Sequence, residues 1–214
     1  MIKNIAFIPA KSISSRVPKK NFKLLNNVPL LDYSIKIAVE CKFIHKVVVS
    51  SNEKIKSDII SDKIEYHVRD KEESDPNISI LKLLNIWRKK NNVEYDNLVL
   101  LQPTHPFRSK IHLLNSISLF QKNEVYDSLV TITNKKIRHI EGTKKLINSE
   151  KNIYQSNRFI NGQIYIFRLK QEISYGENTF LFEIPESEFD INIDEPHDFR
   201  LAELLVHKFN SDIE

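Results

Sequence analysis

The amino-acid sequence predicts an α/β fold in which a mainly parallel sheet is covered by helices. Short apolar runs of strand length alternate with segments of helical periodicity up to about residue 133. Several runs are continuously apolar, as in parallel strands that are buried on both faces. After residue 134 the rhythm changes to short alternating segments and one last helix, which indicates a small additional β element.

The first part of the chain supplies the β-α-β order. Strands are expected at residues 5–8, 47–50, 64–68, 97–101 and 128–133. Helices with apolar residues at three- and four-residue spacing are expected at residues 30–41, 52–60, 78–90 and 109–121, the last with Ser109 as N-cap. This order implies right-handed crossovers, and ligands of such sheets bind beyond the carboxyl ends of the strands.

The second part of the chain is less regular. Residues 134–152 are lysine-rich and weakly patterned, which indicates a loop or a projecting arm. Strands are expected at residues 163–167 and 180–184, and residues 190–194 alternate polar and apolar side chains. Pro196 begins a helix that runs to about residue 210. We therefore expect a single domain over residues 1–214.

Composition excludes several classes of protein. Hydrophobic residues make up 41% of the 214, which is enough for a sizeable core and excludes wholesale disorder. The net charge of +4 is too small to indicate nucleic-acid binding. Cys41 is the only cysteine, so neither a disulfide framework nor a cysteine-based zinc site is expected. Because no apolar run reaches ~18 residues and the start does not resemble a signal peptide, we expect a soluble cytoplasmic protein without a membrane partner.

The segment that follows the first strand, residues 9–21, holds the densest set of candidate functional groups. It carries four cations, three serines and an asparagine: Lys11, Arg16, Lys19, Lys20, Ser12, Ser14, Ser15 and Asn21. Cations in such a loop neutralise a polyphosphate, and hydroxyl and backbone N–H groups donate to its oxygens. A solvated basic loop is the alternative that composition alone favours, whereas the position after strand 1 favours phosphate binding.

The same segment and several later ones resemble one family. Ile8-Pro-Ala-Lys-Ser-Ile-Ser-Ser-Arg-Val-Pro-Lys-Lys-Asn21 is similar to the family motif I-P-A-R-G-G-S-K-R-I-P-x-K-N. Leu100-Leu-Gln-Pro-Thr-His-Pro-Phe-Arg108 is similar to L-L-Q-P-T-S-P-L-R, which is the most specific match. Weaker matches follow at residues 29–35, 47–51, 161–165 and 192–198. The family is the acylneuraminate cytidylyltransferases, which include synthetases of CMP-activated legionaminic and pseudaminic acid.

This resemblance implies a three-layer nucleotidyltransferase fold, Rossmann-like and GT-A-like. Its members bind CTP with magnesium, and the anomeric hydroxyl of a nine-carbon 2-keto acid sugar attacks the α-phosphate, releasing pyrophosphate. Such a reaction depends mainly on positioning and on charge stabilisation. The resemblance also implies a homodimer, with residues 134–160 as a possible dimerisation arm.

Site residues are carried over from the matching motifs. The resemblance implies catalytic roles for Lys11, Lys20 and Gln102. It implies substrate-binding roles for Ser12, Ser15, Arg16, Asn21, Arg69, Asp75, Arg108, Asn161 and Gly162. Arg108 has two readings, a partner of the sugar carboxylate or part of a structural salt bridge, and the second is favoured. Gln102 equally reads as a strand-end cap, and Asn161-Gly162 as an ordinary turn.

Asp194 is the expected magnesium ligand, with Asn192 as a weakened co-ligand. Members carry two aspartates two residues apart, which places both side chains on one face of an extended segment. Asp190 has the same facing and is a possible substitute. The alternative is that Asp194 caps the helix that begins at Pro196.

Three departures from the family pattern leave other functions open. Lys11 replaces an arginine, Ile13 a glycine and Asn192 an aspartate. The alternatives are another sugar nucleotidyltransferase, such as a CMP-Kdo synthetase or a guanylyl- or uridylyltransferase acting on a sugar phosphate, and a non-catalytic paralogue that keeps the fold.

Overall fold

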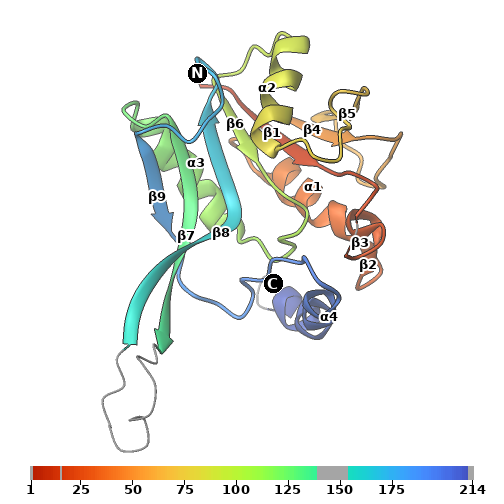
Figure 1. Ribbon diagram of the computed structural model, residues 1–214, viewed down its shortest axis with the longest axis vertical. Coiled ribbons are helices and arrows are strands. Elements are labelled where there is room, and N and C mark those ends of the chain that lie inside the picture. Colours follow the sequence, from red (N-terminus) through yellow and green to blue (C-terminus); the bar gives the residue numbers. More distant parts are fainter. Residues whose placement is uncertain (1, 15, 139–153, 212–214) are drawn as a thin grey trace, which may run out of the picture.

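A seven-stranded sheet forms the centre of the computed structural model, which describes residues 2–14, 16–138 and 154–211 (Figure 1). The strand order is β5-β4-β1-β6-β8-β7-β9. Its first four members, β5 (Ile64–Val68), β4 (Lys46–Ser51), β1 (Asn4–Pro9) and β6 (Asn97–Leu100), are parallel. Strand β8 (Tyr154–Arg168) is antiparallel to both of its neighbours, β6 and β7 (Ser128–Arg138). Strand β9 (Thr179–Glu183) pairs with β7 in parallel. The mainly parallel α/β sheet predicted from the sequence is confirmed.

Helices cover both faces of this sheet. Helices α1 (Leu30–Glu40) and α3 (Lys110–Lys122) pack on one face, where their apolar residues share a core with Ala6 and Ile8 of β1. Helix α2 (Ile80–Lys90) packs on the other face, against Ile5 and Phe7. The alternation along β1 follows from the two-residue period of a strand. Ser109 is the N-cap of α3, as predicted, and accepts a hydrogen bond from the backbone N–H of His112.

A third core lies beside the sheet, where helix α4 (Pro196–Ser211) packs near the short elements that follow the first loop, η1 (Lys20–Phe22), β2 (Leu24–Leu25) and β3 (Val28–Pro29). Residues 190–194 lead into α4 without joining the sheet. Their predicted alternation is confirmed, because Ile191 and Ile193 are buried in this core while Asn192 is exposed. The Ile193 N–H donates to the Thr104 carbonyl, which ties this segment to the loop after β6.

Strands β7 and β8 run on past the rest of the sheet as a two-stranded ribbon (Figure 1). Part of the expected arm is therefore strand, since β7 reaches Arg138, while residues 139–153 lie outside the described part of the chain. The register of the pair shifts between Val130 and Ile132, which face Tyr165 and Ile160. The extra residues of β8 at this bulge include Asn161 and Gly162.

The helix predicted at residues 52–60 is wrong, because this segment is irregular. The Ser57 N–H donates to the Tyr66 hydroxyl, and the Ser57 hydroxyl accepts from the Ile59 N–H. These bonds take N–H groups that a helix would pair with carbonyls four residues earlier. Across the residues that the structure describes, every helix is too short or too polar to span a membrane.

Candidate active site

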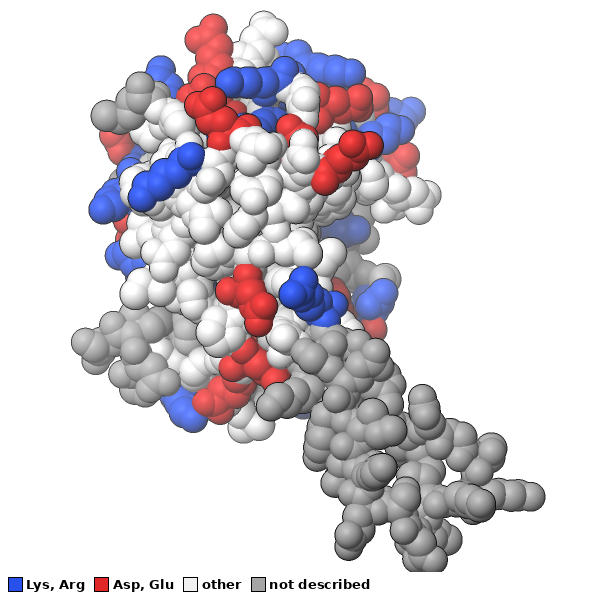
Figure 2. Space-filling view, turned by 90° about the vertical axis from the view of Figure 1, so that its left-hand side faces the viewer, with Lys and Arg blue, Asp and Glu red and all other residues white. Residues whose placement is uncertain are grey.

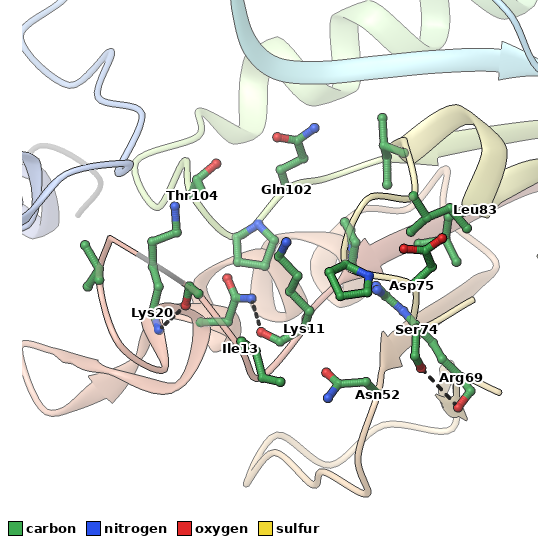
Figure 3. A pocket seen from close by; sticks show the side chains of 18 of the residues that line it. Lys11, Ile13, Lys20, Asn52, Arg69, Ser74, Asp75, Leu83, Gln102 and Thr104 are labelled. Carbon is green, nitrogen blue, oxygen red and sulfur yellow. Dashed lines mark hydrogen bonds between the residues drawn. The ribbon is translucent and has the colours of Figure 1, made fainter. Parts of the chain in front are cut away.

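A cleft of about 410 Å³ opens beyond the carboxyl ends of β1, β4, β5 and β6 (Figure 3). Its position follows the rule for parallel sheets, because the loops after these strands all meet at one edge. The residues that line it are Pro9, Lys11, Ile13, Ser14, Arg16, Val17, Lys20, Asn21, Asn52, Arg69, Ser74, Asp75, Pro76, Ile78, Ile80, Leu83, Gln102, Pro103, Thr104 and Asp194. Eight of the residues predicted from the sequence are among them: Lys11, Arg16, Lys20, Asn21, Arg69, Asp75, Gln102 and Asp194.

One side of the cleft, the loop side, is formed by residues of the loop after β1 and by Asp194. Its members are Lys11, Ile13, Ser14, Arg16, Val17, Lys20, Asn21 and Asp194. Lys20 Nζ donates to the Ile193 carbonyl at 2.6 Å and to Asp194 Oδ1 at 2.9 Å. The Lys20 backbone N–H donates to the Ser14 hydroxyl, and the Asn21 side-chain amide donates to the Lys11 carbonyl. The loop is therefore shaped by its own polar groups, while the Lys11 side chain points into the cleft (Figure 3).

Two other predicted residues of this loop have different surroundings. Arg16 is exposed and its Nη1 lies 3.1 Å from Glu195 Oε1, an ion pair that solvent screens. Ser12 is buried and is not among the lining residues, because its N–H and hydroxyl both face the Asn52 side chain. Ser15 lies outside the described residues.

The opposite side of the cleft, the strand-end side, follows β5 and β6. The Arg69 guanidinium is 8% exposed, and its Nε and Nη2 donate to the Ser50 hydroxyl and carbonyl. Burial lowers the pKa of Arg69 to about 10, against an opposing contribution from Glu73, so the group is a cation at neutral pH. Asp75 Oδ1 accepts from the Asn77 N–H, which holds the loop after β5 in a turn.

Gln102 follows β6, and its backbone is held more firmly than its side chain. Its carbonyl accepts from Arg108 Nη2 at 2.9 Å and from the His105 N–H. Its side-chain amide has no hydrogen-bond partner among the described residues, and it points into the cleft (Figure 3). Rigid backbone with a free amide is the arrangement that suits a group which positions a ligand.

Arg108 does not line the cleft. It is 3% exposed, and it donates to the Gln163 carbonyl, the Ser34 hydroxyl and the Gln102 carbonyl. The acceptors are two carbonyls and a hydroxyl, so the structure contains neither the predicted contact with the cleft nor a salt bridge. Burial lowers the pKa of Arg108 to about 9. The guanidinium joins the loop after β6 to β8 and α1.

Asn161 and Gly162 lie at the bulge of β8, outside the cleft. The Asn161 amide accepts from Thr131 and donates to Thr133, and Thr133 in turn donates to Asp190. Gly162 has a φ of +76°, and a Cβ there would lie 2.6 Å from His105 Nε2. Both facts require glycine at this position. Because the pair lies within β8, it forms a kink in a strand and not a hairpin turn.

His105 is buried between this kink and the loop after β6. Its pKa is lowered to about 3, mainly by burial and then by the charge of Arg108, so the ring is neutral at physiological pH. Its Nδ1 has no partner within the described structure. A buried, neutral ring is not suited to act as a base that exchanges protons with a substrate.

The expected metal ligands lie together at the junction of the two sides. Asp194 Oδ1 faces Lys20, and Asp194 Oδ2 accepts from the Asn192 amide at 2.8 Å. Asp190 is unavailable, because its two oxygens accept from Thr133 and Gln163. The described residues contain no cluster of three or more metal-binding side chains. One partly exposed carboxylate fits magnesium that is held mainly by phosphate oxygens and water.

Several residues of the cleft have no counterpart in the sequence-based predictions. Asn52 directly follows β4, and Ser74 and Thr104 come from the loops after β5 and β6. The Thr104 hydroxyl is buried without a partner in the described structure. An apolar wall of Pro76, Ile78, Ile80 and Leu83 completes the site. Asn52 and Thr104 could have been predicted from the sequence, because each follows a strand of the parallel part of the sheet, where ligands bind.

Comparisons with known proteins give a consistent result. Residues 5–205 match the family model described as cytidylyltransferase. The chain is 30% identical to CMP-N,N'-diacetyllegionaminic acid synthase from Legionella pneumophila, over 94% of this chain and 95% of that protein. It is 29% identical to N-acylneuraminate cytidylyltransferase from Escherichia coli over 97% of this chain, but it spans only 53% of that protein's length. A pseudaminic acid cytidylyltransferase from Campylobacter jejuni is 31% identical over 58% of this chain and 55% of that protein.

Solved structures share the fold at lower sequence identity. A CMP:2-keto-3-deoxy-manno-octonic acid synthetase complexed with CTP superposes with a TM-score of 0.68 and 15% identity, covering 96% of this chain and 99% of that one. The 2-C-methyl-D-erythritol 4-phosphate cytidylyltransferase of Francisella tularensis gives a TM-score of 0.62 at 14% identity, with 94% and 99% covered. At these identities the comparison establishes the fold alone.

Proposed function

The chain belongs to the cytidylyltransferase family, and we propose that it transfers CMP from CTP to a nine-carbon 2-keto acid sugar, a nonulosonic acid, with release of pyrophosphate. The relatives named for N-acylneuraminate, legionaminic acid and pseudaminic acid support this class of sugar. We also propose that the protein carries out this reaction in the cytoplasm.

The observation that carries the proposal is the charge arrangement of the cleft. Three cations of one loop, Lys11, Arg16 and Lys20, line it at the carboxyl ends of parallel strands, and the Asp194 carboxylate lies 2.9 Å from Lys20 Nζ. A triphosphate needs several cations for its oxygens, whereas a single carboxylate is enough for a metal ion that the phosphates also bind. The apolar wall across the cleft offers a surface for the flat face of a base.

In this proposal each side of the cleft has its own part of the reaction. The loop side binds the triphosphate, and the cations of Lys11 and Lys20 stabilise the charge that moves onto the leaving pyrophosphate. The Gln102 amide orients the sugar so that its anomeric hydroxyl lies in line with the α-phosphate. The bond from that hydroxyl oxygen to phosphorus forms while the bond between the α- and β-phosphates breaks, and the hydroxyl proton leaves to solvent.

Asp194 would hold magnesium, with the Asn192 amide oxygen as an uncharged second donor. The ion would neutralise charge on the phosphate oxygens during the transfer. Lys20 already occupies one oxygen of Asp194, so its ammonium would turn toward a phosphate when the nucleotide binds. The Lys20 ammonium would then face a phosphate oxygen, and the Asp194 carboxylate would face the magnesium ion.

The sugar is proposed to lie toward a second hollow of about 150 Å³, lined by Phe159, Ile160, Asn161, Asp190 and Asn192. Asn192 joins this hollow to the cleft through its hydrogen bond with Asp194. The hollow combines exposed apolar side chains with amide groups. That combination suits a sugar that carries hydroxyl and acyl groups, and it gives Asn161 the substrate-binding role that the sequence predicts.

The experiment is a pyrophosphate-release assay with CTP, UTP, GTP and ATP against a panel of 2-keto acid sugars and sugar phosphates. Turnover that requires CTP and a nonulosonic acid supports the proposal. Use of CTP only with the eight-carbon acid Kdo would shift the assignment to a CMP-Kdo synthetase, and use of GTP or UTP with a sugar phosphate would reject it. CTP binding without turnover under all conditions would identify a non-catalytic paralogue.

We also propose that two copies form a homodimer through the ribbon of β7 and β8. Phe159, Ile160 and Leu181 are 40%, 62% and 45% exposed on β8 and β9. The molecule seen from the β9 side of Figure 1 shows a broad uncharged area, above which most charged side chains gather (Figure 2). Light scattering should give twice the chain mass at micromolar concentration, and a monomer at that concentration would contradict the dimer.

A further inference from the structure

Four polar side chains, three of them buried and His67 partly buried, form a chain of contacts beneath the strand-end side of the cleft. They are Ser50 at the end of β4, His67 on β5, and Arg69 and Glu73 in the loop that follows β5. Arg69 Nε lies 2.9 Å from Ser50 Oγ, and Ser50 Oγ lies 3.1 Å from His67 Nδ1. His67 Nε2 lies 3.5 Å from Glu73 Oε2. Ser50 and His67 are paired directly across the two strands.

The direction of these contacts is fixed by the chemistry of arginine. A guanidinium only donates, so the Ser50 hydroxyl accepts from Arg69 and is free to donate its own proton to His67 Nδ1. The proton of a neutral His67 ring must then be on Nε2, where it faces the Glu73 carboxylate. Burial lowers the pKa of His67 and the charge of Arg69 lowers it further, although Glu73, Glu65 and Asp70 oppose this. The neutral ring is the form that the contacts require.

These contacts occupy only part of the Arg69 guanidinium. Nε and Nη2 are held by the Ser50 hydroxyl and carbonyl, whereas Nη1 has no hydrogen-bond partner among the described residues. Arg69 lines the cleft, and Ser50, His67 and Glu73 do not. Glu73 is 2% exposed, and its Oε2 also accepts from the Asp70 N–H, so it anchors the loop that carries Ser74 and Asp75.

We propose that Ser50, His67 and Glu73 are positioning residues that fix the Arg69 guanidinium in one orientation, with Nη1 presented to an oxygen acceptor of the nucleotide. This inference rests on the proposed function, since it needs the nucleotide to occupy the cleft. A Ser-His-Glu set at these distances resembles a nucleophile with its base. Ser50 is fully buried and already accepts from Arg69, so it holds the arginine and does not attack a substrate.

The test combines Ser50→Ala with a matched control, Ser51→Ala. Both serines are fully buried at the end of β4, but only Ser50 contacts the Arg69 guanidinium. Ser51 accepts the Arg69 backbone N–H through its own backbone carbonyl, which Ser51→Ala keeps. Ser50→Ala should weaken CTP binding about threefold to tenfold, the effect of one hydrogen bond, while Ser51→Ala should leave it unchanged. In an Arg69→Ala background Ser50→Ala should have no further effect, because its action passes through the arginine. An equal loss in both backgrounds would show a general structural role and overturn the inference.

A second measurement does not need a nucleotide. Nitrogen-15 NMR of the arginine Nε–H groups in the full chain should show a rigid, slowly exchanging Arg69 signal in the parent and in Ser51→Ala. Ser50→Ala should make this signal mobile, and His67→Phe should shift it. An Arg69 signal that Ser50→Ala leaves unchanged would overturn the inference. A rigid signal in a parent chain that binds no CTP would instead contradict the proposed function, so the two failures are distinguishable.

Discussion

The two sides of the cleft hold their charged groups in opposite ways. On the loop side, Arg16 is exposed and Lys20 shares its ammonium with a carboxylate at the mouth of the cleft. On the strand-end side, Arg69 is buried and two of its donor groups are directed to Ser50. Arg108, outside the cleft, is buried in the same way, with its donors directed to Ser34 and to two backbone carbonyls. A cation that neutralises a highly charged triphosphate needs freedom to reorient, whereas a cation that maintains the shape of a site or presents a single donor group needs fixed partners.

This difference teaches that the type of residue does not decide its role. Lys20 and Arg108 both come from motifs that the sequence singles out, but only Lys20 lines the cleft. Substitutions on the loop side should therefore change ligand binding and turnover, and substitution of Arg108, which lies outside the cleft, should change stability.

The largest effect is expected at Asp194. Asp194→Asn keeps the shape of the side chain and removes the carboxylate that pairs with Lys20 in the cleft. Turnover should fall by at least about 100-fold, because the magnesium ligand is lost while the fold is kept. A magnesium titration of the CTP reaction, with CD spectra as a control for folding, measures this. Parental activity at all magnesium concentrations would show that Asp194 is not the ligand.

Asn192→Asp tests the same metal site by adding a ligand instead of removing one. It adds a second carboxylate two residues before Asp194, in a segment whose alternation places both on one side. The magnesium concentration needed for half-maximal rate should decrease. If the parent is inactive and this variant alone has turnover, the chain has lost its chemistry at this position.

The next effect is on stability and concerns Arg108. Arg108→Met removes a buried guanidinium and leaves the Gln163 carbonyl, the Ser34 hydroxyl and the Gln102 carbonyl without this donor. The free energy of unfolding should decrease by about 3–5 kcal/mol, since each unpaired group costs about 1–3 kcal/mol. Urea titration measures the change. The control is Lys110→Ala, which removes an exposed partner of Glu40 and should cost less than about 1 kcal/mol. Equal effects would contradict the structural role of Arg108.

A smaller effect near neutral pH is expected from His105, and it grows as the pH falls. Its folded-state pKa of about 3 lies below the 6.5 of the unfolded chain, so between these values the unfolded state binds a proton that the folded state does not. The stabilising contribution is complete above pH 6.5 and is lost toward pH 3, at up to about 1.4 kcal/mol per pH unit. His105→Phe should show a shallower decrease than the parent in unfolding titrations without added metal. Parallel pH profiles would contradict a neutral, buried ring.

Much of the loop side could be predicted from the sequence. Local order is sufficient there, because the cations follow the first strand directly and the carboxyl end of that strand faces the cleft. Gln102 was found for the same reason. The helix expected at residues 52–60 failed because the Tyr66 hydroxyl, which belongs to the next strand, takes the Ser57 N–H. Periodicity contains no information about such a partner.

The predicted residues that lie outside the cleft could be placed only in part from the sequence. The sequence marks Arg108 and Asn161, but their partners lie far along the chain, at Gln163 for the arginine and at Thr131 and Thr133 for the asparagine. No spacing rule connects these residues before the sheet is formed. The bulge of β8 that requires Gly162 likewise depends on where His105 packs.

The central claim is that the loop side binds the triphosphate of CTP, and calorimetric titration of CTP into the parent, Lys20→Ala and Lys19→Ala tests it most directly. Lys19 is the matched control, because it carries the same charge next to Lys20 but does not line the cleft. Lys20→Ala should weaken binding by about 1–3 kcal/mol, as expected for a charge-assisted contact, and Lys19→Ala should remain close to the parent. Equal CTP affinity in the parent and a folded Lys20→Ala variant would contradict the account.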